Sequence, residues 1–167
     1  MQVVYGIDGR QKLDEYCLDH LSECENSRPV DASTVLMSMV RFISPLDPMW
    51  LATRRTIEER LVEDILVRRY EVEQTHVDGL PDGEGSFTGC SFWFVECLAR
   101  EGKFEKAQLL FEKLLGYANH LGLYSEQLGA NGQHLGSFPQ AFTHLPLISA
   151  ATYLERTTSR KGERVGH

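Results

Sequence analysis

The sequence predicts an all-α protein with a single core. Apolar residues recur at helical spacing in several segments, and long loops rich in glycine and proline divide these segments into pieces the size of helical hairpins. The 167 residues, 42% of them hydrophobic and 25% charged, suffice for one soluble domain. Each expected element follows from one of these patterns.

The first half of the chain carries signals for three helices. A short helix is expected over residues 13–21. Asp31 can cap a second helix, because aspartate is a favoured N-cap residue. The apolar face of that helix would comprise Val35, Leu36, Met39, Val40 and Ile43. Pro48 suits the first turn of a third helix ending near Glu63, and β-branched and aromatic residues over 66–77 predict a short hairpin.

The second half predicts a helical hairpin between two long loops. Residues 78–85 form a loop, and a helix apolar on nearly all sides should follow over residues 89–100. Gly102 then separates it from an amphipathic helix. The apolar face of this helix comprises Phe104, Ala107, Leu110, Phe111, Leu114 and Leu115. A second long loop is expected over 124–137 and a last helix over 139–153; long loops of this kind are often functional.

Charge and hydropathy argue against two classes of partner. The net charge is −7 without a basic stripe, so nucleic-acid binding is not expected. No apolar run reaches the roughly 20 residues that a membrane helix needs, which predicts no membrane partner. The start of the sequence lacks the pattern of a secretion signal, which favours a cytoplasmic location. The basic run near the C-terminus predicts a solvated polar tail over residues 156–167.

The four cysteines are expected to be reduced. Cys90 and Cys97 share one face of the predicted helix but lie two turns apart, about 10 Å along its axis, too far for a disulfide. Cys17 and Cys24 repeat this spacing. No Cys-x-x-Cys motif is present and the histidines lack ligand spacing, so no metal site is expected.

The loops and the apolar helix offer candidate binding residues, each with an ordinary structural alternative. The segment Gly83-Glu84-Gly85 lacks the residues of a phosphate-binding loop, but it can present Glu84 to a pocket, with Ser86 or Thr88 capping the next helix. A flexible turn with a solvated glutamate would explain it equally. Trp93 can stack on a sugar, although a tryptophan on an apolar helix more often belongs to the core.

Glu126 is the most informative acidic residue because of its surroundings. Taken alone, a glutamate in a loop is normally solvated. The strings Leu-Tyr-Ser-Glu-Gln-Leu over 123–128 and Leu-Gly-Ser-Phe-Pro-Gln-Ala-Phe-Thr-His over 135–144 are longer and more unusual. Together with residues 78–93 and 1–30, they resemble glycoside hydrolase family 15, the family of glucoamylases, glucodextranases and bacterial trehalases.

This resemblance implies a fold, a reaction and roles for three residues. Residues 1–155 would form an incomplete (α/α)6 barrel of helical hairpins, with loops at one end forming a sugar pocket. The implied reaction is inverting hydrolysis of terminal α-glucosides, with Glu126 as general base and with Glu84 and Trp93 binding the substrate. Inversion also requires a catalytic acid about 6.5–9.5 Å from the base, but neither metal nor cofactor.

The sequence departs from the family pattern after residues 27–30. There it continues directly with residues 31–33, which resemble a point much further along in relatives, whereas relatives first have a helical stretch with a Trp-Glu string that bears the acid. Here Trp50 precedes Leu51 and Trp93 precedes Phe94. The chain is therefore expected to be truncated, internally deleted and inactive alone, since acid–base assistance contributes about 10²–10⁴-fold.

Two other functions remain open from the sequence. A non-catalytic remnant could still bind sugar through Glu84, Trp93 and Glu126, or be inert. Residues 97–111 also resemble one unit of a helical-repeat interaction module. Such modules need about three repeats, and no second copy follows about 34 residues away.

Overall fold

The computed structural model describes residues 30–70 and 85–165. Within these ranges the chain is helical, apart from two small sheets of two-residue strands, which confirms the all-α prediction. The helices are η1 (Ala32–Val35), α2 (Leu36–Met39), α3 (Pro48–Leu61), α4 (Thr88–Arg100), α5 (Phe104–Leu115) and α6 (Ala141–Val165). The helix expected over residues 13–21, the loop over 78–84 and Glu84 lie outside the described residues.

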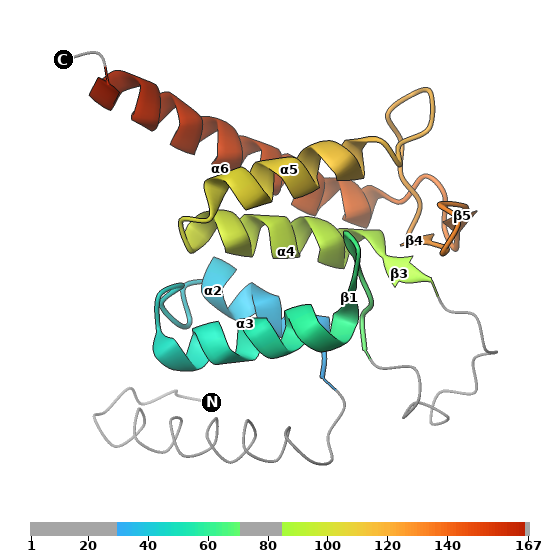
Figure 1. Cartoon of the computed structure of the whole chain (residues 1–167). Helices are drawn as coiled ribbons and strands as arrows, with labels where there is room; N and C mark the ends of the chain where they lie inside the picture. Colours follow the sequence, from blue (N-terminus) through green and yellow to red (C-terminus); the bar gives the residue numbers. More distant parts are fainter. Residues whose placement is uncertain (1–29, 71–84, 166–167) are drawn as a thin grey trace, which may run out of the picture.

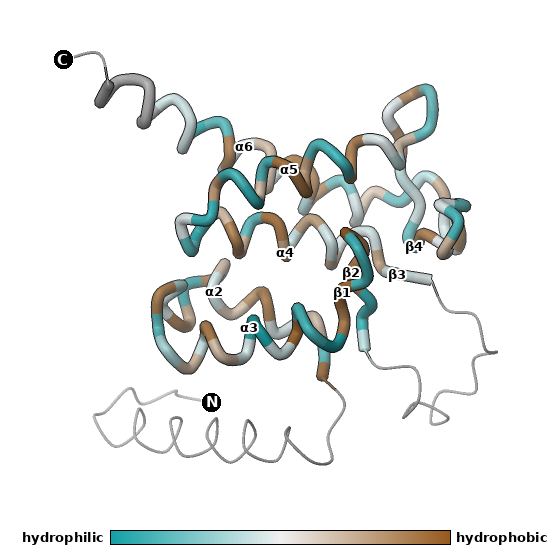
Figure 2. Tube along the Cα trace, in the orientation of Figure 1, coloured by the Kyte–Doolittle hydropathy of each residue, from teal (hydrophilic) through white to brown (hydrophobic). Residues whose placement is uncertain are grey.

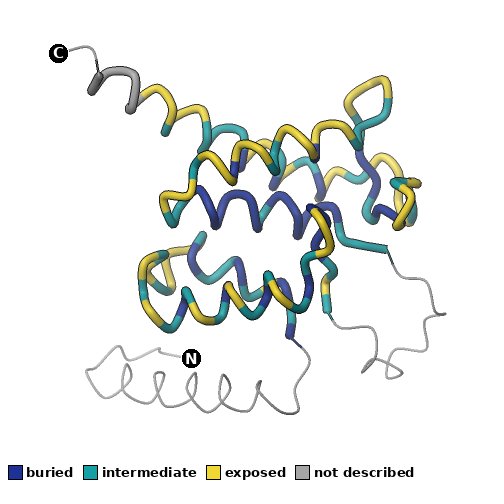
Figure 3. Tube along the Cα trace, viewed as in Figure 1, coloured by how far each residue is buried: buried dark blue, intermediate teal, exposed yellow. Residues whose placement is uncertain are grey.

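Helix α4 is the centre of the fold. It lies between a layer of α2 and α3 and a layer of α5 and α6 (Figure 1). Every residue from Thr88 to Ala99 except Trp93 is buried, so α4 is dark along almost its whole length in Figure 3. The prediction of a helix that is apolar nearly all round is confirmed, because α4 is covered from both layers.

In the first layer, the helix predicted after Asp31 begins as expected but ends before Ile43. The carboxylate of Asp31 accepts a hydrogen bond from the backbone N–H of Ser33 at 2.7 Å and so caps η1. The helix expected to run to Ile43 ends at Met39, because Arg41 adopts a left-handed conformation with φ 61°. Val40, expected on the apolar face, is 70% exposed. Its assignment to that face was wrong because the helical spacing does not extend past Met39.

Helix α3 starts and ends close to its predicted bounds. Pro48 occupies the first turn, and Asp47 accepts a hydrogen bond from the N–H of Met49 at 2.9 Å. The buried face of α3 comprises Trp50, Arg54, Ile57 and Leu61. Arg54 is buried but paired, since its Nε donates to Glu101 at 3.0 Å and its Nη1 donates to Glu58. This network joins α3 to the end of α4.

The described residues contain a hairpin that begins before the predicted span, of which residues 71–77 lie outside the described residues. Strand β1 (Val62–Glu63) pairs antiparallel with β2 (Leu66–Val67), and Asp64 makes the turn with φ 55°. The expected span of 66–77 therefore contains only the second strand among the described residues. Leu66 and Val67 are both buried against α4. Their apolar side chains therefore marked β2 in the sequence, although its partner β1 was not predicted.

The hairpin of α4 and α5 matches the prediction. Gly102 makes the turn with φ 85°, and hydrophilic and hydrophobic residues alternate along α5 (Figure 2). Ala107 and Leu114 are the buried residues of α5. Phe92 of α4 packs edge-on against Phe111, with ring centroids 5.9 Å apart.

Helix α6 packs along α4 and is longer than expected. It spans Ala141–Val165 with Pro146 inside it, whereas the sequence predicted an end at residue 153. The run proposed as a tail is therefore helical as far as Val165. The domain boundary at residue 155 stays a prediction. Buried Glu96 links the two helices by accepting hydrogen bonds from Ser149 at 2.6 Å and from Arg100 at 2.6 and 2.9 Å.

Cys90 and Cys97 are free thiols buried on α4, as expected. Burial raises the pKa of each thiol to about 12. Cys17 and Cys24 lie outside the described residues.

Candidate functional site

Glu126 lies immediately before the middle strand of a small sheet. The sheet has the antiparallel order β3 (Ser86–Phe87), β4 (Gln127–Leu128), β5 (His134–Leu135). The loop expected over 124–137 is thus partly a hairpin (Figure 1). Asn131-Gly132 supplies its turn, with Gly132 at φ 74°, and Asn-Gly is a strong hairpin signal that the prediction did not use.

Three backbone groups fix the position of Glu126. Its N–H donates to the carbonyl of Ser137 at 2.9 Å, and its carbonyl accepts from the N–H of Thr88 at 3.1 Å. Its side-chain Oε2 accepts from the N–H of Ser137 at 3.1 Å. Glu126 is therefore tied both to the first residue of α4 and to the segment that leads into α6.

Only one carboxylate oxygen of Glu126 is held in this way. Within the described part of the chain, Oε1 receives no hydrogen bond, and the residue is half-buried. A carboxylate with one anchored and one available oxygen can accept a proton at a defined position.

Gly136 makes room for this carboxylate. A Cβ atom at this position would lie 2.9 Å from Oε2 of Glu126, closer than ordinary contact. Gly136 also has φ 70°, a conformation that side-chain-bearing residues rarely adopt. Any other residue here would displace the glutamate or the backbone beside it.

Ser125 and His134 stabilise the strand end next to Glu126. The hydroxyl of Ser125 donates to the carbonyl of Gln127 at 2.5 Å, so its oxygen is left to accept from Nδ1 of His134 at 2.9 Å. This arrangement requires a proton on Nδ1 of His134. The imidazole also packs against Phe138, with ring centroids 5.1 Å apart.

The loop is joined to α6 through Gln140 and Thr143. The N–H of Gln140 donates to the carbonyl of Tyr124 at 3.0 Å, and the hydroxyl of Thr143 donates to Oε1 of Gln140 at 2.6 Å. Tyr124 is buried, donates to the carbonyl of Leu114 at 3.2 Å and packs edge-on against Phe92 at 5.4 Å. The Glu126 segment is thereby attached to α4, α5 and α6.

The backbone makes a close approach at Gly85, whereas the predicted presentation of Glu84 to a pocket lies outside the described residues. A Cβ atom at Gly85 would lie 2.6 Å from the carbonyl oxygen of Leu128, and the Gly85 N–H donates to Oε1 of Gln127 at 3.1 Å. The predicted caps were wrong. The N-cap of α4 is Phe87, without a side-chain hydrogen bond, because the first N–H of the helix is used by the carbonyl of Glu126.

Trp93 lies one and a half turns further along α4. It is half-buried, packs against the core and contacts Phe142 of α6 edge-on at 5.7 Å. Thr88, the first residue of α4, donates its N–H to the carbonyl of Glu126, so α4 positions both Trp93 and Glu126. The sugar-binding role of Trp93 stays a prediction, as do the roles of Glu84 and Glu126.

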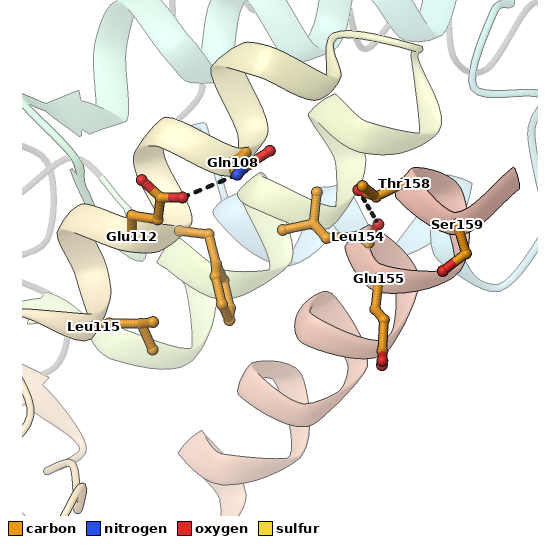
Figure 4. A pocket seen from close by; sticks show the side chains of 8 residues that line it. Gln108, Glu112, Leu115, Leu154, Glu155, Thr158 and Ser159 are labelled. Atoms are coloured by element: carbon orange, nitrogen blue, oxygen red, sulfur yellow. Dashed lines mark hydrogen bonds between the residues drawn. The ribbon is translucent and has the colours of Figure 1, made fainter. Parts of the chain in front are cut away.

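A separate groove of about 410 Å³ lies between the second halves of α5 and α6 (Figure 4). Its lining residues are Gln108, Phe111, Glu112, Leu115, Leu154, Glu155, Thr158 and Ser159. Leu154 is eleven residues beyond Thr143, about 16 Å along the helix. The groove is therefore distinct from the surroundings of Glu126.

The described residues include no group of three His, Cys, Asp or Glu side chains arranged to hold a metal ion. Among the helices of those same segments, none is long and apolar enough to cross a membrane.

Sequence reasoning missed the residues that position Glu126. Gly136 and Ser137 belong to the string used for the resemblance, but the string does not reveal that they contact the carboxylate. The contact of His134 with Ser125 was not predicted, because strand β5 was not expected. The Asn131-Gly132 pair, a hairpin-turn signal, is the feature that could have indicated strand β5.

Comparison with known proteins identifies relatives of most of the chain. The family model described as glycosyl hydrolases family 15 matches residues 14–152. The trehalase of Mycolicibacterium smegmatis is 48% identical over 128 residues, 76% of this chain. The trehalase of Mycobacterium tuberculosis is 42% identical over 163 residues, 91% of this chain, and that of Thermoplasma acidophilum is 37% identical over 141 residues, 83% of this chain.

A solved chain described as a wild-type glycosidase has the same fold. It superposes with a TM-score of 0.64 at 20% identity, over 78% of this chain and 37% of its own. This similarity confirms the predicted partial six-hairpin fold. The chain spans only about a fifth to a quarter of the curated relatives, 19% of the Mycolicibacterium smegmatis protein and 24% of the Mycobacterium tuberculosis and Thermoplasma acidophilum proteins.

Proposed function

Because this chain belongs to glycoside hydrolase family 15, we propose that its Glu126 segment supplies the general-base half of an inverting α-glucoside hydrolase site. The observation that carries the proposal is the reciprocal bonding of Glu126 and Ser137, which fixes one carboxylate oxygen, while the other receives no hydrogen bond from the described residues. General-base catalysis requires this combination of a fixed position and a free lone pair.

The proposed reaction follows from the geometry that inversion needs. A water molecule donates a proton to Oε1 of Glu126 while its oxygen attacks the anomeric carbon, and the bond to the leaving oxygen breaks. A second carboxyl group must protonate that leaving oxygen from the opposite face, about 6.5–9.5 Å from the base. We propose that this acid comes from residues other than the 167 of this sequence, since the Trp-Glu string expected to bear it is absent.

Trehalose is the proposed substrate. The relatives that are 37–48% identical to this chain are all described as trehalases. Trehalose presents the terminal α-glucoside that the proposed chemistry requires. Maltose is the matched comparison, because it has the same terminal sugar in a different linkage.

The direct test transplants the matched region of this chain into the Mycolicibacterium smegmatis trehalase. The chimaera should hydrolyse trehalose, and Glu126→Gln should lower kcat by about 10²–10⁴-fold with an unchanged melting temperature. Glu105→Gln, an exposed glutamate in the first turn of α5, is the control and should change neither. Equal turnover by the Glu126→Gln chimaera would exclude the role of Glu126.

The isolated 167-residue chain should not turn over trehalose or maltose. Measurable turnover that disappears in Glu126→Gln would show that the chain holds a complete site, contrary to the proposal. Persistent turnover in both forms would point to a contaminating enzyme.

A non-catalytic sugar-binding role is the second candidate. It is favoured by Trp93, which is half-buried on α4, the helix that bonds Glu126. The Trp93 ring lies beside Phe142 of α6. Isothermal titration with glucose, trehalose and maltose tests it, with Trp93→Phe as the conservative variant. Absence of heat with all three sugars would exclude this role for the isolated chain.

A further inference from the structure

His134 lies beside Glu126 and has no part in the proton transfer proposed above. Its Nδ1 is 2.9 Å from the hydroxyl oxygen of Ser125, the residue that precedes Glu126. Two residues after His134, Gly136 lies so close to Glu126 that a Cβ atom on the glycine would be 2.9 Å from Oε2. His134 is therefore joined to the surroundings of the carboxylate at two points, through its ring and through its backbone.

The Ser125 hydroxyl decides which nitrogen of His134 carries the proton. It donates its own hydrogen to the carbonyl of Gln127 at 2.5 Å, so toward the imidazole its oxygen can only accept. Nδ1 must then be the donor, and in the neutral ring Nε2 keeps a bare lone pair. A free histidine side chain prefers the opposite tautomer. The fold therefore selects an imidazole that accepts a hydrogen bond at Nε2.

The orientation of the imidazole is also fixed. The ring packs edge-on against Phe138, with ring centroids 5.1 Å apart and an interplanar angle of 61°. Phe138 directly follows Ser137, whose N–H bonds the Glu126 carboxylate. Since a histidine side chain has two rotatable bonds, these two contacts leave it little freedom, and a ligand that uses Nε2 loses little binding energy to ordering.

Nε2 and the neighbouring aromatic ring are available to a ligand. His134 is exposed, and its Nε2 makes no hydrogen bond with any residue that the structure describes. Phe138 is 46% exposed. A hydrogen-bond acceptor beside an aromatic ring suits a sugar, because a hydroxyl can donate to the nitrogen while the apolar face of the sugar packs on the ring.

The geometry of inversion specifies which half of a disaccharide His134 would meet. The base and the leaving oxygen lie on opposite faces of the sugar ring that carries the attacked carbon. His134 is bonded to the residue next to the base, so it lies on the side of the base. It would therefore contact the glucose unit that is attacked, and not the sugar that leaves.

We propose that His134 is a substrate-binding residue whose Nε2 accepts a hydrogen bond from a hydroxyl of the attacked glucose unit. The inference rests on the proposed function for the place of the sugar. It does not require proton transfer to Glu126.

Two amide substitutions separate the two nitrogens of His134. The amide of asparagine can replace Nδ1, and the amide of glutamine can replace Nε2. His134→Asn should therefore keep the bond to Ser125 and lose the sugar contact, whereas His134→Gln should keep the sugar contact. If His134 only held Ser125, sugar binding would suffer more from His134→Gln than from His134→Asn.

The test measures trehalose binding by isothermal titration to the Glu126→Gln chimaera with the Mycolicibacterium smegmatis trehalase, in which little substrate is consumed. His134→Asn should raise Kd by about 3–10-fold, the effect of one neutral hydrogen bond, with an unchanged melting temperature. His134→Gln should raise Kd by less than about twofold. His120→Asn is the matched control, an exposed histidine in the loop between α5 and β4, and should leave Kd unchanged.

Trehalose analogues that lack the same hydroxyl in both glucose units identify the group that donates to His134. For one of these analogues His134→Asn should cause no further loss of affinity, because the contact is already missing. A further loss of about 3–10-fold for every analogue would overturn the inference.

The tautomer is tested in the isolated 167-residue chain by nitrogen NMR of the imidazole. Above neutral pH, the proton of His134 should be on Nδ1. A proton on Nε2 would overturn the inference, because that nitrogen could then not accept from a hydroxyl.

Three results of the titrations would also overturn it. These are an unchanged Kd in His134→Asn, a greater loss in His134→Gln than in His134→Asn, and absence of trehalose binding to the chimaera. The readout is Kd in a background without the Glu126 carboxylate, so its failure is separate from a failure of the kcat test. Full turnover by the Glu126→Gln chimaera would exclude the base and leave the result for His134 standing.

Discussion

Glu126 and Ser137 exchange two hydrogen bonds, one from the Glu126 N–H to the Ser137 carbonyl at 2.9 Å and one from the Ser137 N–H to Oε2 of Glu126 at 3.1 Å. The pair closes the loop between β4 and α6 on itself. The carboxylate is therefore positioned by backbone groups, which a side-chain substitution elsewhere in the loop does not remove.

Gly136→Ala should destabilise the chain more than Gly122→Ala. Both glycines have positive φ, 70° and 75°, but only at Gly136 would a Cβ atom meet Glu126, whereas nothing lies within 4 Å at Gly122. Gly122→Ala should cost about 1 kcal/mol and Gly136→Ala roughly 2–4 kcal/mol, measured by urea unfolding. The difference should shrink in a Glu126→Ala background, and a difference that stays unchanged would refute the contact.

Arg100→Leu should destabilise the chain by about 3–5 kcal/mol, because it leaves the buried carboxylate of Glu96 without its charge partner. The double substitution Glu96→Leu/Arg100→Leu should recover much of this loss, since no charge then remains buried. Ser149→Ala, which removes one hydrogen bond to Glu96, should cost about 1–3 kcal/mol. A double variant as unstable as Arg100→Leu would contradict this explanation.

Thr88→Val and Thr143→Val should have opposite consequences although they remove the same hydroxyl group. The buried hydroxyl of Thr88 has no hydrogen-bond partner within the described residues, so valine should be neutral or stabilising there. The hydroxyl of Thr143 donates to Gln140 at 2.6 Å, so valine should cost about 1–3 kcal/mol. Equal losses, measured by thermal unfolding, would show that Thr88 does have a partner.

The buried thiols should make the chain less stable at alkaline pH. Burial raises the pKa of Cys90 and of Cys97 from the ordinary 9.0 to about 12. Between these values the unfolded chain loses a proton that the folded chain keeps, so stability is intact below pH 9 and falls as pH rises toward 12. Each thiol should lower the free energy of unfolding by about 1.4 kcal/mol per pH unit in that window.

A Cys17→Ser/Cys24→Ser background leaves Cys90 and Cys97 as the only thiols for this measurement. Maleimide should react with them only after denaturation. Between pH 9 and 10, Cys90→Ala should remove about half of this pH dependence; above pH 10 the fraction is smaller, because burial also raises the pKa of Tyr124 from 10.0 to about 12. Rapid labelling of the folded chain at pH 8 would show that the thiols are accessible, contrary to their burial.

The helical part of the fold could be predicted because its signals are local. Pro48, Gly102 and the apolar spacing of α4 and α5 mark helix ends and buried faces within short windows. The end of α2 could not be found in this way. It depends on Arg41 adopting a left-handed conformation, and the sequence has no glycine or proline at that position to indicate it.

The candidate site could be found from the sequence only as a string of residues. Glu126 was located by the resemblance, but its hydrogen bonds depend on pairing between β3, β4 and β5, whose two-residue strands are too short to give an alternating pattern. The close approach at Gly85 was not predicted, because its partner, the carbonyl of Leu128, lies 43 residues away in the sequence. Distant pairings of this sort cannot be inferred from one sequence.

The two tryptophans of this chain are natural fluorescent reporters of different regions. Trp50 of α3 is buried in the core, whereas Trp93 of α4 is half-buried against Phe142 in the first turn of α6. Trp50→Phe would leave Trp93 as the single emitter, on the helix whose first N–H bonds the carbonyl of Glu126. A shift in its emission would then report a change in solvent contact beside Phe142 directly in solution, without a label and without turnover of any sugar.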